Sequence, residues 1–276
     1  MPRGDARPEG EPGSPSVRVG SHPANRWIVS ESGVDLSRSE PRPARKIRVA
    51  AEPQDVVIDL GRTAIVVVDM QNDFCAEGGY LSRSGVDCGP AQRLIAPIDR
   101  LLQAVRPLDV PVIWLNWSVR PDRLDLGPAL PHVHNHDLVD ADPGGVSTAF
   151  LQSKGGWGAF AGQWGAEIVH GLHVEAQDIH VSKRRFSGFF ATELDAVLRN
   201  MGVSTLFFAG VATDICVLAT LQDAMFLGYD VLMMDDCVAT NSPEYCVQAA
   251  KYHVKQLFGF MTRSTSLMDG IKEIDP

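Results

Sequence analysis

The chain has 276 residues, of which 45% are hydrophobic, and this is enough for the core of one α/β domain or of two small ones. Its formal net charge of −9 argues against a nucleic-acid partner and against an anionic membrane surface. It has no apolar run of the ~18 residues that a membrane span needs, and its N-terminus lacks the apolar segment of a secretory signal. The five cysteines are scattered and form no CxxC pair, so we expect a reducing, cytoplasmic environment.

Residues 1–55 are predicted to form an N-terminal extended arm. Residues 1 to about 50 are rich in Pro, Gly, Arg and Ser, and this composition alone indicates disorder. The stretch Arg26-Trp27-Ile28-Val29 is an exception, because it brings three large apolar side chains together. We therefore expect the arm to lie on a neighbouring subunit, and a tag-like tail is the alternative.

The first two strands of the core are predicted over residues 64–68 and 110–115. Both are continuous apolar runs, which is typical of parallel strands buried on both faces. The first run ends at Asp69, and a loop is expected over residues 69–89. Gly89-Pro90 opens a helix whose apolar residues recur at helical spacing as far as Val105.

A long irregular segment follows, from Asn116 to about Gly165. A loop of this length in a compact domain is usually functional, so we expect it to shape a pocket. It contains His132, His134 and His136, and alternating histidines can bind metal. These three have no carboxylate or cysteine at a standard ligand spacing, so the preferred interpretation is solvated loop histidines and no metal site.

The second half of the chain continues to alternate helices and strands. Helical character is expected near residues 165–172, and a short strand over 178–182 ends at Lys183. Further elements are predicted in this order: a helix over 192–202, a strand over 203–210, a helix from about 213, a strand over 229–234, a helix over 243–256, a strand over 258–261 and a helix from 264. This alternation is typical of a parallel sheet with helices on both faces. We find no internal repeat and no GxGxxG motif, so a dinucleotide site is not expected.

Cys216 falls in the first turn of the helix that follows the strand over 203–210. A thiol in that position is close to unpaired backbone N–H groups and to the positive end of the helix dipole. Both favour the thiolate, which is the nucleophilic form of cysteine. The alternative is that Cys216 is a small buried hydrophobic residue, as most free cysteines are.

Three chemically useful residues each follow a predicted strand: Asp69, Lys183 and Cys216. Ligands of open α/β sheets bind beyond the carboxyl ends of the strands, so these residues are expected to converge. Asp69 can serve as general base, and the Cys216 thiolate can attack a carbonyl carbon. The positive charge of Lys183 can stabilise both the carboxylate and the thiolate. Backbone N–H groups around Ala212 and Cys216 would stabilise the oxyanion, by about 3–4 kcal/mol each in favourable cases. Individually, the three residues could be a loop cap, a solvated cation and a core residue.

The segments around these residues resemble the isochorismatase-like cysteine hydrolases. The matching motifs are Asp69 within Val67–Phe74, then Lys183, then Cys216 within Gly210–Val217. The resemblance runs from about residue 56 to the C-terminus and implies one domain over residues 56–276. It implies a three-layer α/β/α sandwich around a six-stranded parallel sheet of order 3-2-1-4-5-6.

The same resemblance implies an Asp–Lys–Cys catalytic triad at Asp69, Lys183 and Cys216, with an oxyanion hole at Ala212 and Cys216. It also implies a cis peptide bond between Val211 and Ala212 and a homo-oligomer (dimer or tetramer). We expect no cofactor. Isochorismatases proper lack the cysteine, so Cys216 indicates the amidohydrolase branch.

Finer motifs narrow the expected substrate. Gly78–Leu81 and Arg185–Thr192 resemble the ureidoacrylate amidohydrolases, and the biuret and triuret hydrolases share a stretch like Arg120-Pro121-Asp122. These enzymes cleave a carbamoyl or ureido C–N bond, which implies a small amide, ureide or carbamate substrate. Nicotinamidases carry a metal site after the second strand, but here Asn116–Arg120 has no histidine. The alternatives are an amidase or lactam hydrolase of the same family with a larger substrate, and a non-catalytic binding module on this fold.

Five residues next to the triad are candidates for binding the substrate. Asn72 and Asn116 could hydrogen-bond a ureido group, and Phe74, Trp117 and Phe186 could wall the site and exclude water. The ordinary alternatives are asparagines in turns and aromatic residues in the core.

Overall fold

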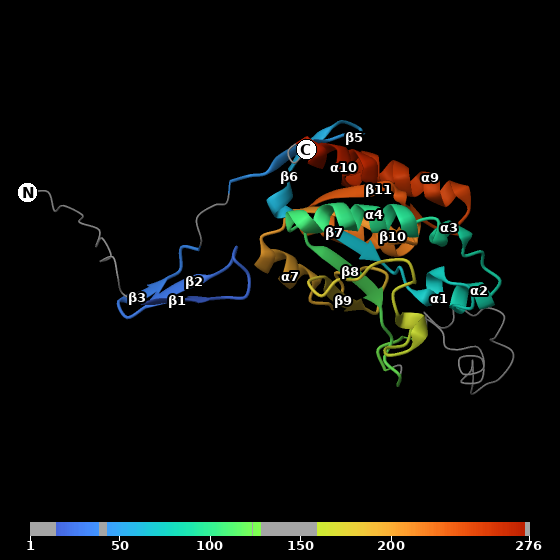
Figure 1. Cartoon of the computed structure of the whole chain (residues 1–276). Helices are drawn as coiled ribbons and strands as arrows, with labels where there is room; N and C mark the ends of the chain where they lie inside the picture. The colour runs from blue at the N-terminus through green and yellow to red at the C-terminus, as the bar shows by residue number, and fades with distance from the viewer. Residues whose placement is uncertain (1–14, 39–42, 123, 128–158, 274–276) are drawn as a thin grey trace, which may run out of the picture.

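The computed structural model describes residues 15–38, 43–122, 124–127 and 159–273, and a seven-stranded sheet forms its centre (Figure 1). The strands are β5 (Ala51–Glu52), β7 (Thr63–Val68), β8 (Val112–Trp117), β9 (Ile179–Lys183), β10 (Thr205–Val211), β11 (Asp230–Ala239) and β12 (Phe260–Thr262). The six strands β7 to β12 are parallel and lie in the order 3-2-1-4-5-6, which confirms the prediction. The seventh strand, β5, pairs antiparallel with β12 at the edge and was not predicted.

Helices cover both faces of this sheet, so the molecule is the expected three-layer sandwich. One face carries α3 (Gly89–Gln92), α4 (Ile95–Val105) and α10 (Ser264–Lys272), and α4 lies across the front of the sheet in Figure 1. The other face carries α7 (Leu194–Met201), α8 (Leu218–Phe226) and the turn η6 (Val254–Phe258), which follows α9 (Glu244–His253). Alternate residues of β7 serve the two layers, because successive side chains of a strand point to opposite faces.

The loop predicted over residues 69–89 contains two short helices, α1 (Asn72–Cys75) and α2 (Tyr80–Arg83). The helical character expected near residues 165–172 is reduced to a single 3₁₀ turn, η4 (Trp164–Ala166), so this prediction is wrong. Gly171 has a φ of +99°, a conformation that interrupts a helix. Three further turns complete the described part: η1 (Leu60–Arg62), η2 (Arg106–Leu108) and the π-helical η5 (Thr213–Val217).

Packing with the core begins before the expected domain boundary at Val56. β4 (Lys46–Val49) pairs antiparallel with β6 (Val56–Asp59), and the side chains of Ile47 and Val49 are buried in the same cluster as α4 and α10. The backbone of β4 lies against α10, where a Cβ on Gly270 would come within 2.3 Å of the carbonyl oxygen of Arg48. This part of the expected arm therefore belongs to the packed domain.

The earlier part of the arm forms a small antiparallel sheet of β1 (Ser16–Val19), β2 (Trp27–Ser30) and β3 (Gly33–Asp35). It stands away from the main body in Figure 1. Its turn contacts the end of α7, where Asn25 Nδ2 donates a hydrogen bond of 2.8 Å to Asn200 Oδ1. The composition of this region indicated disorder and hid these strands.

His132, His134 and His136, with most of the long segment after Asn116, lie outside the described residues. None of the helices in the described part is long and apolar enough to cross a membrane.

Candidate active site

Asp69 is placed by the end of β7. Its φ of +51° is a left-handed conformation, which aspartate tolerates better than most residues, and it breaks the strand at this point. The Asp69 N–H still donates to the carbonyl oxygen of Leu115, so the residue remains anchored to β8. Its carboxylate accepts a hydrogen bond of 2.9 Å from the backbone N–H of Trp117 through Oδ1. The carboxylate therefore has a fixed orientation at the carboxyl edge of the sheet.

Lys183 is the last residue of β9, and its side chain has no exposure to solvent. Nζ lies 2.8 Å from Asp69 Oδ2, donates to the carbonyl oxygen of Arg185 at 3.2 Å, and sits 4.4 Å from the centre of the Trp117 ring. Burial alone would lower the pKa of Lys183, but the Asp69 carboxylate and the Cys216 thiol raise it above its ordinary value. Lys183 is therefore a buried ammonium ion, and the alternative of a solvated surface cation is excluded.

Cys216 lies in η5, directly after β10. The backbone of β10 approaches β7 so closely that a Cβ on Gly210 would come within 2.0 Å of the carbonyl oxygen of Val68. Only glycine fits there, with a φ of +109°. The peptide bond between Val211 and Ala212 is cis, as the resemblance implied.

Burial dominates the electrostatics of the Cys216 thiol. It raises the pKa of Cys216, the Lys183 ammonium lowers it, and the Asp69 carboxylate raises it again, with a net result well above the ordinary value. The start of a helix was expected to favour the thiolate, but in this site the resting group is the thiol. A nucleophilic sulfur therefore requires a base that removes its proton, and the Asp69 carboxylate faces it in the same cavity.

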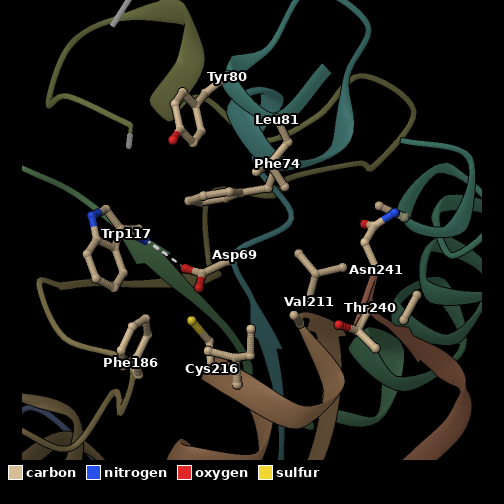
Figure 2. A pocket seen from close by; sticks show the side chains of 14 residues that line it. Asp69, Phe74, Tyr80, Leu81, Trp117, Phe186, Val211, Cys216, Thr240 and Asn241 are labelled. Atoms are coloured by element: carbon tan, nitrogen blue, oxygen red, sulfur yellow. Dashed lines mark hydrogen bonds between the residues drawn. The ribbon is translucent and has the colours of Figure 1, made fainter. Parts of the chain in front are cut away.

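Asp69 and Cys216 form the floor of a cavity of about 820 Å³, including its open mouth (Figure 2). The walls are mostly apolar. Four aromatic side chains line the cavity: Phe74, Tyr80, Trp117 and Phe186. The other apolar side chains are smaller, and they include Leu81, Val211 and Ile215. A site of this kind excludes water and strengthens the electrostatic interactions among the groups that it contains.

The structure separates the five predicted substrate-binding residues into two groups. Phe74, Trp117 and Phe186 line the cavity, and the Trp117 and Phe186 rings have centroids 6.0 Å apart. Asn72 does not line it, because its Nδ2 donates to the carbonyl oxygen of Trp164 at 2.8 Å and holds α1 against η4. Asn116 does not line it either and lies within β8.

Several residues at the site were not predicted as functional. Tyr80 and Leu81 reach the cavity from α2, and Thr240 and Asn241 reach it from the end of β11. Gln71 is fully buried behind it: Nε2 donates to the carbonyl oxygens of Trp117 and Ala166, and Oε1 accepts the Trp117 N–H, each at 2.8 Å.

Comparison with known proteins places this geometry in a family. The family model described as the isochorismatase domain matches residues 63–266. The chain belongs to the isochorismatase family. It is 32% identical to the ureidoacrylate amidohydrolase RutB of Rhizobium rhizogenes, over 84% of this chain and 93% of the relative. It is 34% identical to the RutB of Agrobacterium fabrum, over 82% of this chain and 97% of the relative.

Solved structures of the isochorismatase family share the fold. A cysteine hydrolase from Pseudomonas syringae pv. phaseolicola superposes with a TM-score of 0.64 at 27% identity, covering 85% of this chain and 99% of that chain. An isochorismatase family protein from Desulfovibrio vulgaris superposes with a TM-score of 0.60 at 28% identity, covering 75% of this chain and 97% of that chain.

The described residues contain no group of three or more His, Cys, Asp or Glu side chains that could hold a metal ion. The polar groups that approach Asp69 there are an ammonium ion, a thiol and a backbone N–H. The described part of the site thus combines a carboxylate that can accept a proton, a cation and a thiol that can become a nucleophile.

Proposed function

We propose that this member of the isochorismatase family is an amidohydrolase that cleaves a carbamoyl or ureido C–N bond of a small molecule through Cys216. The observation that carries the proposal is the buried Lys183–Asp69 ion pair beside the Cys216 thiol, at the floor of one cavity. The two RutB relatives, named as ureidoacrylate amidohydrolases, support the choice of bond. The substrate class is a small amide, ureide or carbamate.

The first step forms the bond between sulfur and carbon. Asp69 accepts the proton from the Cys216 thiol while the sulfur attacks the carbonyl carbon, and the electron pair of the C=O bond moves to the oxygen. Lys183 stays protonated and balances the negative charge that passes between carboxylate, sulfur and oxygen. Because the triad is buried, this charge is screened only weakly by solvent.

The backbone N–H groups of Ala212 and Cys216 would stabilise the oxyanion. Both residues line the cavity next to the thiol. The Ala212 carbonyl accepts hydrogen bonds from the N–H groups of Ile215 and Val217. These bonds fix the turn that contains both Ala212 and Cys216. Each such donor contributes about 3–4 kcal/mol in favourable cases.

The second half of the reaction returns the enzyme to its starting state. The C–N bond breaks, its electron pair goes to the nitrogen, and Asp69 gives that nitrogen the proton it took from the thiol. Asp69 then takes a proton from water as the water attacks the acyl carbon, and the proton passes to the departing Cys216 sulfur. A carbamoyl group released in this way yields carbamate, which decomposes to ammonia and carbon dioxide.

An ammonia-release screen tests the proposal. The substrates are ureidoacrylate, biuret, triuret, N-carbamoyl amino acids and simple aryl amides and carbamates. Wild type is compared with Cys216→Ala and with Cys246→Ala, a partly exposed cysteine outside the cavity lining. We expect release from wild type and Cys246→Ala and none from Cys216→Ala. Release that persists in Cys216→Ala, or no turnover of any substrate by wild type, would contradict the mechanism.

We also propose that the protein is a homo-oligomer in which the β1–β3 sheet lies on a neighbouring copy. The cross-strand register places Val17 opposite Val29 and Val29 opposite Val34, with Val19 opposite Trp27, so these side chains share one face. Four of them are 42–65% exposed in the single chain. An apolar face of this kind is typical of a surface that a partner covers. All five cysteines are unpaired, which supports a reducing, cytoplasmic setting.

A further inference from the structure

The end of the cavity away from Trp117 and Phe186 is formed by Thr240 and Asn241, which directly follow β11 (Figure 2). Val211 lies between them and the Cys216 thiol in the view of Figure 2. A substrate with its carbonyl carbon at Cys216 can therefore extend past an apolar stretch to these two polar side chains at the rim.

Asn241 presents an acceptor to this end of the cavity. Its Nδ2 donates a hydrogen bond of 2.7 Å to the carbonyl oxygen of Asp87. A carbonyl oxygen can only accept, so this contact fixes which end of the amide faces Asp87. The other end, Oδ1, is turned toward the cavity in Figure 2.

Thr240 offers an acceptor as well. Its hydroxyl proton is used in a hydrogen bond of 3.2 Å to Ser242 Oγ, and its oxygen accepts the Ser242 N–H at 3.1 Å. One lone pair of the Thr240 oxygen remains for a ligand. One N–H of the Asn241 amide and the Thr240 hydroxyl proton are thus used within the protein, and the two side-chain oxygens can accept a hydrogen bond from the substrate.

We propose that Thr240 and Asn241 form a subsite for an uncharged N–H group at the far end of the substrate, such as a primary amide or a second ureido group. The proposal rests on the proposed function and narrows its substrate class. A neutral N–H donor gains a hydrogen bond to each acceptor. A carboxylate, such as the one that the name ureidoacrylate implies, would meet two acceptors and apolar walls, which disfavours it. The lining residues that the structure describes include no Arg or Lys to offset that charge.

Matched substrate pairs test this inference. Ureidoacrylamide is compared with ureidoacrylate, and 4-ureidobenzamide with 4-ureidobenzoate, so that each pair has the same scissile bond and differs only in the distal amide or carboxylate. We expect kcat/KM for the amide of each pair to be higher by about tenfold, with most of the difference in KM. A carboxylate that is turned over as well as its amide, or better, overturns the inference.

Binding to Cys216→Ala by calorimetry provides a readout that does not need turnover. The amide of each pair should bind more tightly than the acid, and equal or reversed affinity counts against the subsite. The outcomes also separate the two proposals. If both members of a pair are turned over and the acid is preferred, the proposed subsite is wrong and the proposed amidohydrolase activity stands. If wild type turns over no substrate, both proposals are wrong.

A charge reversal at the subsite gives an independent test. Asn241→Lys replaces the acceptor with a cation, so the amide-to-acid ratio of kcat/KM should fall by about tenfold or more, mainly through KM. Gln103→Lys adds the same charge on an exposed position of α4, outside the cavity lining, and should leave the ratio unchanged. Thermal unfolding confirms that both variants are folded. A ratio that does not move in folded Asn241→Lys contradicts the proposed contact.

Discussion

Lys183 is the residue whose setting departs most from ordinary behaviour, because its ammonium group is entirely buried and touches Asp69, Arg185 and the Trp117 ring. In the proposed mechanism it balances the charge that moves among Asp69, Cys216 and the oxyanion. Lys183→Met keeps much of the side-chain volume and removes the charge, so we expect kcat to fall by about 10²–10⁴.

Lys251→Met is the matched control, because Lys251 makes a partly exposed ion pair with Asp235 outside the cavity lining. It should change kcat less than twofold. Circular dichroism of both variants separates lost chemistry from lost structure. A folded Lys183→Met enzyme with near-normal kcat would remove Lys183 from the mechanism.

The resting state of Cys216 gives a pH prediction. Burial holds the pKa of this thiol above its ordinary value, and only the thiolate reacts with iodoacetamide. Without substrate, alkylation of Cys216 should therefore be slow near pH 7 and rise about tenfold per pH unit through pH 9. The measurement is peptide mass spectrometry on a Cys246→Ser background, which removes the most exposed cysteine. An alkylation rate that no longer rises with pH above about pH 7 would show that Cys216 is already a thiolate and would contradict this prediction.

Gln71 positions the site without lining it. Its amide holds the carbonyl oxygens of Trp117 and Ala166, and the Trp117 N–H that it shares with Asp69 orients the carboxylate. Gln71→Leu would leave the two buried carbonyls without their donor, at about 1–3 kcal/mol each.

We expect Gln71→Leu to lower both the free energy of unfolding and kcat, measured by urea titration and steady-state kinetics. Gln71→Glu keeps the acceptor and loses the donor, so it should restore part of kcat while remaining destabilised. A kcat unchanged in both variants would show that the role is structural alone.

At the scale of elements, the ion pair of Arg106 and Asp178 joins the end of α4 to the start of β9. Arg106 Nη2 lies 2.6 Å from Asp178 Oδ2, and Trp114 Nε1 donates to the same oxygen at 2.9 Å. Both charged side chains are at least 96% buried. Asp178→Asn removes the nearer carboxylate of the buried Arg106 and leaves it with Glu175 at 3.7 Å, so we expect it to lower the free energy of unfolding by about 3 kcal/mol.

The same pair predicts an acid dependence. Burial alone would raise the pKa of Asp178, but hydrogen bonds from Arg106, Glu175 and Trp114 hold it below its ordinary value. Because the pKa of Asp178 is lower in the folded state than in the unfolded state, the ionised Asp178 stabilises the fold fully above about pH 4. This stabilisation is lost as the pH falls through the pKa of the folded state. Urea titrations from pH 7 to pH 3 should show the gap between wild type and Asp178→Asn narrowing. Asp230→Asn changes an exposed carboxylate at the start of β11 and serves as control, for which we expect no such narrowing.

The elements that could be predicted were those with strong local signals. Continuous apolar runs located β7, β8 and β10 to within two residues, because parallel strands buried on both faces need apolar residues at nearly every position. β11 was predicted to end at Met234, yet it continues to Ala239 through Asp235 and Asp236. This charged pair is typical of a strand end. Thr240 and Asn241 were therefore not recognised as the residues that follow the strand, which is the position that identified Asp69 as a candidate site residue.

The same reasoning explains which site residues could be found. Asp69, Lys183 and Cys216 each lie at the carboxyl end of a strand or just beyond it, so topology alone brings them together. Asn72 and Asn116 were chosen for the hydrogen bonds that their side chains can make, and neither lines the cavity. Which partner an asparagine binds depends on packing between distant segments, as with Asn72 and Trp164, and no local pattern encodes it.

At the scale of the whole molecule, the β1–β3 sheet carries a prediction about assembly. Trp27 belongs to its apolar face, whereas Ile28 points to the opposite face, and each is 42% exposed. If a second copy covers the apolar face, Trp27→Asp should lower the molar mass in light scattering, because a buried unpaired carboxylate is costly. Ile28→Asp should leave the mass unchanged. Equal masses for wild type and Trp27→Asp would contradict a role of this sheet in assembly.

The central position of β7 has a consequence for how the chain matures. β7 pairs with β8 on one side and with β10 on the other, and all six of its residues are buried. On a ribosome, β7, β8 and β9 emerge before β10. One edge of β7 then has unpaired backbone groups and apolar side chains until β10 arrives, some 137 residues after β7 ends. Such an edge recruits other strands. The nascent half-sheet is therefore the stage at which this protein is most prone to aggregate, and Cys216 reaches the site only when that edge closes.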